Sequence, residues 1–281
     1  MGKENAWFHL DNNAFTYSNA FFDEVRSVPL HIQDYGYEIF LFLGGNAVFS
    51  VDGNIYELNP YDILIMNMRE LHAPIFKDKT PYARKCMVFS PSFMSGFITS
   101  EFNPFRIFEA RGRGTHNKIE AKLVREHELD KAFMDIETCL TDNKPGSEMM
   151  VKAYLAIMLV KMNRIMVFSS ASRPQNERIG EIIKYIDENL DADLSHKALS
   201  EKLFINKSYL YHLFKNETGF SINQYISHRR IIKAKELMIA GASSTEVAIL
   251  TGFGDYSNFY RTFKRLTGNS PKAFLEKTIE K

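Results

Sequence analysis

The sequence predicts an α+β protein of two domains, an N-terminal β-barrel with a helical hairpin and a C-terminal all-α domain. Three observations lead to this prediction. Short apolar segments separated by turn residues fill roughly the first hundred positions, two long helical patterns follow, and a helical motif then occurs twice. The small and polar segment 169–176 is the predicted linker between domains 1–168 and 177–281.

The N-terminal domain alternates between apolar runs and turn signals. The predicted strands are residues 38–45, 46–51, 54–58, 63–66 and 82–89. Asp52 and Gly53 form a strong hairpin signal between two of these segments. Many short strands at regular spacing predict a barrel or a sandwich.

Two helical patterns follow the strands. In residues 118–141 and 147–168, apolar side chains recur at intervals of three and four, and Pro145 and Gly146 mark the turn between them. The second pattern is apolar nearly all round, so this helix must be buried on more than one side. One side would face the barrel. The other would face either more core or the partner subunit of a homodimer.

The C-terminal domain repeats one motif. Identical residues recur 49 positions apart at Ser208 and Ser257, Phe214 and Phe263, Lys215 and Lys264, and Gly219 and Gly268. Each copy is a short helix, a turn, and a second helix that begins after an N-cap (Asn206 or Asp255) and ends at glycine. This is the pattern of a helix-turn-helix, whose second helix enters the DNA major groove.

The long helix predicted for residues 222–240 lies between the two copies. Nineteen residues at the helical rise span roughly 28 Å, close to the ~34 Å that separates successive major-groove faces. One rigid helix can therefore hold two DNA-reading units, or heads, each with the second helix of one helix-turn-helix copy, on one side of the duplex.

The charge distribution favours the same partner. Residues 197–272 hold twelve Lys and Arg against five Asp and Glu, whereas residues 1–172 hold eighteen against twenty-one. A basic block on a mildly acidic remainder is typical of a nucleic-acid module attached to another domain. We therefore expect double-stranded DNA as a partner.

The second copy, Gly252-Phe-x-Asp-x-Ser-x-Phe-x-Arg-x-Phe-Lys-x-x-x-Gly-x-x-Pro271, resembles the signature of the AraC/XylS family of bacterial transcription regulators. Upstream, residues 208–219 and the segment from Arg230 to Ala234 resemble the same family. Ser200 departs from the alanine that many members carry, but it is small enough for the same helix contact. The resemblance implies a regulator, with activation and contact with RNA polymerase as the expected mode.

The family's base-facing positions, together with helical spacing, identify the candidate DNA-binding residues. They are Lys207, Ser208, Tyr211, His212 and Lys215 in the first head, and Tyr256, Ser257, Tyr260, Arg261, Lys264 and Arg265 in the second. Arg261 can read a guanine edge with two hydrogen bonds, and the alternative is that it holds a phosphate. Lys215, Lys264 and Arg265 lie near helix ends and are predicted to hold phosphates.

Residues 38–72 resemble the cupin-like sensor domain that often precedes an AraC-type reader. That resemblance implies a jelly-roll barrel around a ligand cavity. The residues expected at or near the barrel mouth are His31, Tyr35, Tyr37, Glu38 and His72. There they either bind a small ligand or satisfy buried polar neighbours. Neutral polar groups beside aromatic rings suit a sugar or another small polar metabolite, and Glu38 could accept hydrogen bonds from hydroxyl groups. The resemblance also points to sugars and related carbon sources, so we expect a small-molecule effector of this kind.

The sequence does not favour a metal or another cofactor. Metal-binding cupins present His-x-His, a glutamate and a distant histidine, and here Gln33 replaces one imidazole. Nor does any motif in the sequence support catalysis. Two alternatives remain, a cupin-type metal enzyme and a ligand-binding module whose helical domain binds protein. The basic excess favours DNA over both.

The sequence also predicts where the protein works. No apolar run has the length of a signal peptide or a membrane span, and Cys86 and Cys139 show no disulfide or zinc spacing. We therefore expect a soluble, cytoplasmic protein.

Overall fold

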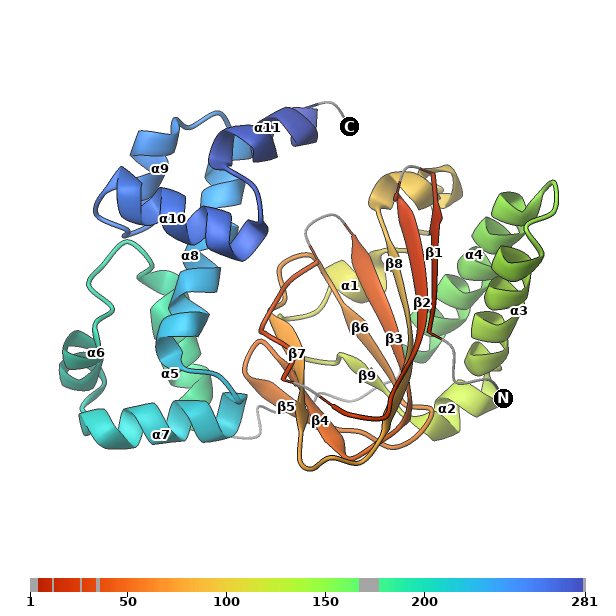
Figure 1. Ribbon diagram of the computed structural model, residues 1–281, viewed down its shortest axis with the longest axis horizontal. Helices are drawn as coiled ribbons and strands as arrows, with labels where there is room; N and C mark the ends of the chain where they lie inside the picture. The colour runs from red at the N-terminus through yellow and green to blue at the C-terminus, as the bar shows by residue number, and fades with distance from the viewer. Residues whose placement is uncertain (1–4, 12, 26, 34–35, 167–176, 280–281) are drawn as a thin grey trace. The chain divides into compact units, whose positions relative to one another are not determined.

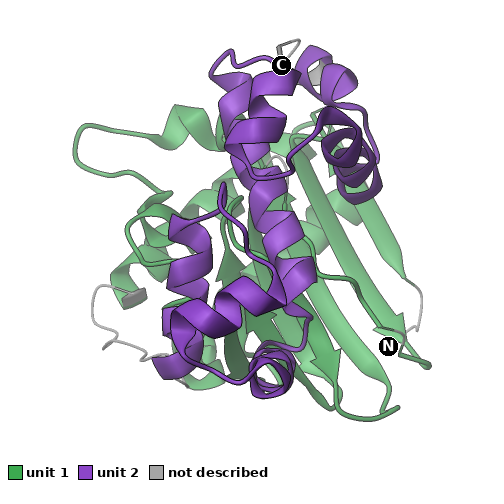
Figure 2. Ribbon diagram, turned by 90° about the vertical axis from the view of Figure 1, so that its left-hand side faces the viewer, with its two compact units in different colours: residues 1–173 green, residues 174–281 purple. Residues whose placement is uncertain are grey.

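A computed structural model describes residues 5–11, 13–25, 27–33, 36–166 and 177–279 (Figure 1). The chain divides into two compact units, Met1–Arg173 and Pro174–Lys281 (Figure 2). The first is rich in strands and the second is helical, which confirms the predicted α+β fold with two domains. The predicted linker 169–176 lies outside the described residues.

Two antiparallel sheets form the first unit. The larger sheet has the strand order β1 (Ala6–Leu10), β2 (Phe15–Phe22), β8 (Tyr82–Phe89), β3 (Tyr37–Gly44), β6 (Ile63–Met66) and β9 (Lys118–Ile119). The smaller has the order β5 (Asn54–Glu57), β4 (Ala47–Val51) and β7 (His72–Phe76). The predicted strands are present, and β1, β2, β7 and β9 are additions that the sequence pattern did not predict.

The larger sheet is buried on both faces. Along β3, Phe40 and Phe42 pack toward the smaller sheet, in a core that includes Phe49. The alternate residues Ile39 and Leu41 belong to a second core, which the sheet shares with helices. Successive side chains of a strand point to opposite faces, so a strand buried on both sides is a continuous apolar run.

The predicted helix over 118–141 is wrong in its extent. This segment forms β9, α2 (Ala121–Glu126) and most of α3 (Leu129–Asp142). The break is at Glu128, whose φ of 56° places it in the left-handed region that a helix cannot contain. α3 and α4 (Ser147–Met166) then pack against each other as a hairpin beside the larger sheet (Figure 1).

Two short elements join the strands to this hairpin, the 3-10 helix η1 (Pro91–Phe97) and α1 (Arg106–Glu109). Among the described residues, no helix is both long enough and apolar enough to cross a membrane.

The second unit contains both copies of the repeated motif. Its helices are α5 (Glu177–Glu188), α6 (His196–Leu203), α7 (Lys207–Thr218), α8 (Ile222–Ile239), α9 (Ser244–Leu250), α10 (Tyr256–Thr267) and α11 (Pro271–Ile279). The Asn206 side chain accepts hydrogen bonds from two backbone N–H groups of α7, and Asp255 accepts one in α10. Both helices end at a left-handed glycine, Gly219 or Gly268, as predicted.

The long helix α8 connects the two copies (Figure 1). Its residues Ile231, Ala234 and Met238 share a core with Phe259 and Phe263 of α10. At its other end, α8 packs against α7, where the rings of Phe214 and Tyr225 meet edge to face. The two candidate reading helices are thus fixed to one rigid element.

Candidate DNA-reading helices and effector cavity

The first candidate reading helix, α7, presents most of its predicted residues to solvent. Lys207, Ser208, His212 and Lys215 are exposed, while Leu210 and Phe214 are buried. Tyr211 is half-buried, with its ring 6.2 Å from that of His196 on α6.

The second candidate, α10, has a stronger basic face. Tyr256, Ser257, Arg261, Lys264 and Arg265 are exposed, and Tyr260 is half-buried, with its ring 6.0 Å from that of Tyr256. The Nε of Arg261 donates to the carbonyl oxygen of Ser257 at 3.3 Å. This bond directs the side chain back toward the helix N-terminus and leaves the other guanidinium donors for a base edge or a phosphate.

In the first unit, a cavity of about 800 Å³ lies on the inner face of the larger sheet. Side chains from β2, β3 and β8 line it together with side chains from β4 and β7 of the smaller sheet. More than half of the lining side chains are aromatic or aliphatic, and the others are polar or charged. Apolar walls with few polar groups are typical of a small-molecule site.

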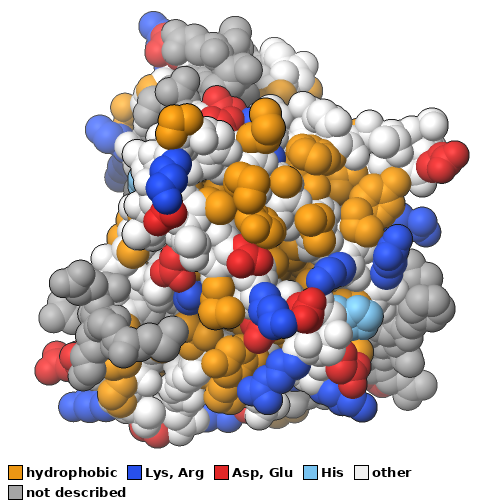
Figure 3. Space-filling view, turned by 90° about the vertical axis from the view of Figure 1, so that its right-hand side faces the viewer, with side chains coloured by type: hydrophobic (Ala, Val, Ile, Leu, Met, Phe, Trp, Pro, Cys, Tyr) orange, Lys and Arg blue, Asp and Glu red, His pale blue; other side chains and the backbone are white. Residues whose placement is uncertain are grey.

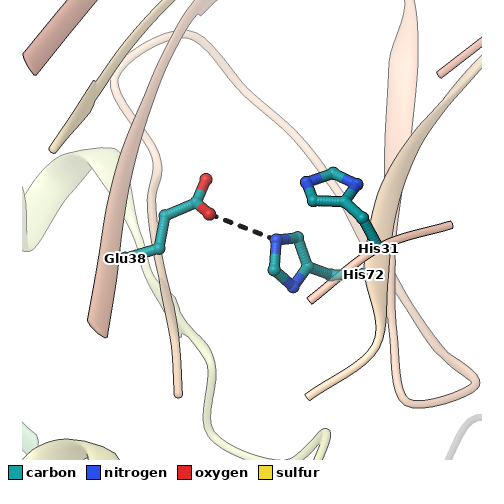
Figure 4. Close-up of side chains that lie close together, drawn as sticks. All are labelled: His31, Glu38 and His72. Carbon is teal, nitrogen blue, oxygen red and sulfur yellow. Dashed lines mark hydrogen bonds and ion pairs between the residues drawn. The ribbon is translucent and has the colours of Figure 1, made fainter. Parts of the chain in front are cut away.

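A buried ion pair closes one end of the cavity. The Nε2 of His72 lies 3.1 Å from the Oε2 of Glu38, and both side chains are buried (Figure 4). Glu38 also accepts a hydrogen bond from the side-chain amide of Gln33 at 2.6 Å and one from the thiol of Cys86 at 3.2 Å. Both carboxylate oxygens are therefore engaged.

The charges of this pair follow from its surroundings. Burial alone raises the pKa of Glu38, but the charge and the hydrogen bond of His72 outweigh burial and lower that pKa to about 2. Burial lowers the pKa of His72, and the Glu38 carboxylate more than compensates, so the pKa of His72 is raised. Burial and the neighbouring His72 both lower the pKa of His31. The cluster thus holds a Glu38–His72 ion pair and a neutral His31.

His31, Glu38 and His72 could also hold a divalent metal ion, since their donor atoms lie within 4.8 Å of one another. The Nδ1 atoms of His31 and His72 are 3.0 and 2.8 Å from the backbone oxygens of Pro29 and Glu70. This arrangement orients both rings as in metal sites and leaves the Nε2 of His31 for a ligand, whereas the Nε2 of His72 is paired with Glu38. A metal would have to displace the proton that His72 shares with Glu38.

Two of the predicted ligand-binding residues do not line the cavity. Tyr37 precedes Glu38 on β3 and faces the opposite side of the sheet, where its ring stacks on Phe105 and Phe108 and its hydroxyl donates to Glu109 at 2.5 Å. The expectation that Tyr37 lies at the barrel mouth is therefore wrong, because neighbouring strand residues alternate between faces. His72 is fully buried beside Glu38.

His31 and Glu38 do line the cavity. Tyr35 lies outside the described residues.

Arg84 and Tyr82 line the cavity but were not among the residues expected from the sequence. Arg84 of β8 is half-buried, donates to the Oγ of Ser18 at 2.8 Å and lies 6.0 Å from the ring of Trp7. Tyr82, two residues earlier, lines the same wall. The available signal was the period-2 pattern of Tyr82, Arg84, Cys86 and Val88, which places all four on one face of the strand.

Both units match known protein families. An AraC-like ligand binding domain matches residues 16–157, and a helix-turn-helix domain matches residues 199–277.

The chain belongs to the AraC family.

It is an AraC-family DNA-binding transcriptional regulator with an N-terminal ligand-binding domain. It is 24% identical over 260 residues to the uncharacterised HTH-type transcriptional regulator YbfI of Bacillus subtilis, covering 92% of this chain and 90% of YbfI. It is also 24% identical over 270 residues to the arabinose operon regulatory protein of Salmonella typhimurium, covering 92% of this chain and 89% of that protein.

Among solved structures, the chain resembles ToxT of Vibrio cholerae, an AraC-like protein whose structure contains an unsaturated fatty acid. The TM-score is 0.43 and the identity 14%, over 98% of this chain and 97% of ToxT.

Proposed function

We propose that this AraC-family protein is a homodimeric transcriptional activator that responds to a small molecule bound in the cavity of its first unit. The proposal depends above all on one observation, that α7 and α10 both pack against the long helix α8. Both helices expose polar and basic side chains on the faces that α8 does not cover. Two such faces on one rigid helix suit two successive segments of the major groove.

Of the two helices, α10 is proposed to discriminate more strongly between base sequences. Arg261 can make two hydrogen bonds to a guanine, whereas Tyr211 and His212 of α7 are poorer base readers. Lys215, Lys264 and Arg265 are proposed to hold phosphates. Selection of a binding site from random duplexes, followed by titration of the selected site, tests DNA binding directly. Binding that does not depend on sequence at any salt concentration would contradict the proposal.

The effector is proposed to bind among the side chains that line the 800 Å³ cavity. The expectation of a sugar rested partly on Glu38 as an acceptor for hydroxyl groups. Both oxygens of Glu38 already accept hydrogen bonds or pair with His72, so this part of the argument no longer supports a sugar. The cavity itself remains the best supported effector site.

The homodimer is proposed to form through the α3–α4 hairpin. Apolar side chains gather on this face of the first unit (Figure 3). Met134, Met149, Met150 and Ile157 are between 47% and 77% exposed. A contiguous exposed apolar face is typical of an interaction surface. The helical spacing of Met150, Ala153 and Ile157 places them on one stripe of α4.

An activator also needs RNA polymerase as a protein partner, and it acts in the cytoplasm, where the bacterial chromosome lies. We propose no catalytic role. Glu38, the buried carboxylate of the cavity lining, is engaged by His72 and Cys86.

A further inference from the structure

Arg84 places a half-buried positive charge on the wall of the cavity. Its guanidinium donates to the Ser18 hydroxyl and lies over the ring of Trp7. Among the described residues, no carboxylate lies within salt-bridge distance of it. A half-buried cation held only by a hydroxyl and a ring lacks the partner that buried charges normally have.

The acidic residues of the cavity do not supply that partner. Glu38 is engaged by His72, Gln33 and Cys86. Asp23 and Glu24 also line the cavity, but both side chains are exposed to solvent. The wall around Arg84 therefore carries an uncompensated positive charge.

Tyr82 adds a second unsatisfied group on the same wall. Its ring is 2% exposed, and its hydroxyl has no hydrogen-bond partner among the residues that the structure describes. Tyr82 and Arg84 are two residues apart on β8, so their side chains leave the same face of the strand. Buried polar groups are normally paired, so an unpaired hydroxyl on the same strand face as a cation without a carboxylate partner points to a ligand.

Thr16, Ser27, His31 and Gln33 add further polar groups to the lining, but the majority of the lining side chains are apolar. Among these are Phe40, Phe49, Pro74, Phe76 and Val88. Such walls suit a hydrocarbon or aromatic body rather than a ring of hydroxyl groups, each of which would need its own partner. One cation matches a single negative charge, whereas a doubly charged phosphate would call for more donors than this wall offers.

We propose that the effector is a small organic carboxylate with an apolar body, whose carboxylate pairs with Arg84 and accepts a hydrogen bond from Tyr82. This inference rests on the proposed function, because it names the chemical class of the molecule that the sensor unit binds.

Trp7 is the single tryptophan of the chain and lies beside Arg84, so its fluorescence reports on this wall. The full-length protein is titrated with matched acids and primary amides: octanoate and octanamide, decanoate and decanamide, 3-phenylpropionate and 3-phenylpropionamide. L-Arabinose serves as the neutral polyol. We expect at least one acid to change the Trp7 emission and to bind at least tenfold more tightly than its amide.

In the same titrations, the Arg84→Gln variant is expected to bind that acid at least tenfold more weakly than the unchanged protein does. Its affinity for the matching amide should stay the same. Tyr82→Phe should also reduce the affinity for the acid, but by a smaller factor. The control is Arg125→Gln, since Arg125 also lies over an aromatic ring, that of Tyr61, but does not line the cavity. Circular dichroism checks that each variant is folded.

Three results would overturn the inference: no acid binds, an amide or L-arabinose binds as tightly as every acid, or Arg84→Gln binds the acid as tightly as the unchanged protein. DNA binding without any ligand is measured on the same samples. If DNA binding is intact and the acids fail, only the carboxylate assignment falls. If the unchanged protein does not bind specific DNA, the proposed function itself falls.

Discussion

Glu38 of β3 and His72 of β7 form an ion pair of 3.1 Å that joins the larger sheet to the smaller one. The two residues are 34 positions apart, and both are buried. A backbone bridge between His31 and His72 ties the segment before β3 to the same place. One cluster therefore connects both sheets and an end of the cavity.

Replacing Glu38 by glutamine should destabilise the first unit by about 3 kcal/mol near pH 6, because it leaves the buried His72 without its counter-charge. Urea unfolding followed by the fluorescence of Trp7 measures this unit, since Trp7 is the only tryptophan and belongs to β1. Glu57→Gln is the control, because the Glu57–Lys77 pair is exposed and should contribute little. Equal effects of the two substitutions would contradict the role of the pair.

The pair also predicts a pH profile of stability. The pKa of Glu38 is lowered from 4.5 to about 2, so its contribution is present above pH 4.5 and is lost as the pH falls toward 2. The pKa of His72 is raised above 6.5, so its contribution is present below pH 6.5 and is lost as the pH rises through the raised pKa. The pair should contribute most between pH 4.5 and 6.5, and Glu38→Gln should flatten both flanks of the stability curve.

Arg261→Ala should weaken binding to the selected DNA site by roughly 1–3 kcal/mol and relax the preference at one base pair. Lys264→Ala should instead lower the affinity for all duplexes by a similar factor and reduce the salt dependence of binding. Competition between the selected site and single-base variants separates the two effects. A uniform loss with Arg261→Ala would show that Arg261 holds a phosphate.

Gly252→Ala should destabilise the second unit more than Gly254→Ala. Both glycines have positive φ, 73° and 80°, so both substitutions carry a backbone cost of about 1 kcal/mol. A Cβ at Gly252 would also lie 2.4 Å from the carbonyl oxygen of Leu190 and 2.6 Å from a guanidinium nitrogen of Arg230, whereas a Cβ at Gly254 meets nothing within 4 Å. Thermal unfolding of the two variants should therefore differ clearly, and equal midpoints would show that the contact with Arg230 adjusts freely.

Ile157→Glu should convert the proposed dimer into a monomer, since it places a charge in the centre of the exposed α4 stripe. The matched control is Ile249→Glu on α9, because Ile249 is similarly exposed but belongs to the other unit. Light scattering after size exclusion gives the mass of each variant. A monomeric parent protein, or a dimer that survives Ile157→Glu, would contradict the α3–α4 interface.

We expect the protein to work without a metal, because the proton between Glu38 and His72 already satisfies the cluster and Gln33 contributes an amide in place of an imidazole. Metal analysis of protein purified without chelator should find no stoichiometric transition metal, and EDTA should leave its melting temperature unchanged. Bound metal that His31→Ala removes would contradict this expectation.

Local chemistry allowed much of the second unit to be predicted from the sequence. The caps at Asn206 and Asp255 and the glycines that end α7 and α10 act within a few residues of their own position. The repeat spacing added the long helix α8 between them. In the first unit, the β3, β6 and β8 segments were predicted for a similar reason, since a strand buried on both faces is a continuous apolar run.

Other features depend on contacts between distant segments. The sequence could not show that the helical pattern breaks at Glu128, because a left-handed glutamate is unfavourable locally and is held by the packing of α2 and α3. It placed Tyr37 and Glu38 together at the barrel mouth, although neighbouring strand residues must face opposite sides.

By itself, the sequence determined the family, the two domains and the candidate reading helices, because those features depend on residues close together in the chain. Only the tertiary structure decided which side of β3 faces the cavity, since that depends on where the α3–α4 hairpin covers the larger sheet. It also brought Arg84 beside Trp7 and Ser18, and it engaged Glu38 with His72. A buried charged group can bind a ligand only if it is not already paired within the protein. The pairing partners come from strands far apart in the sequence, so the sequence alone does not reveal them.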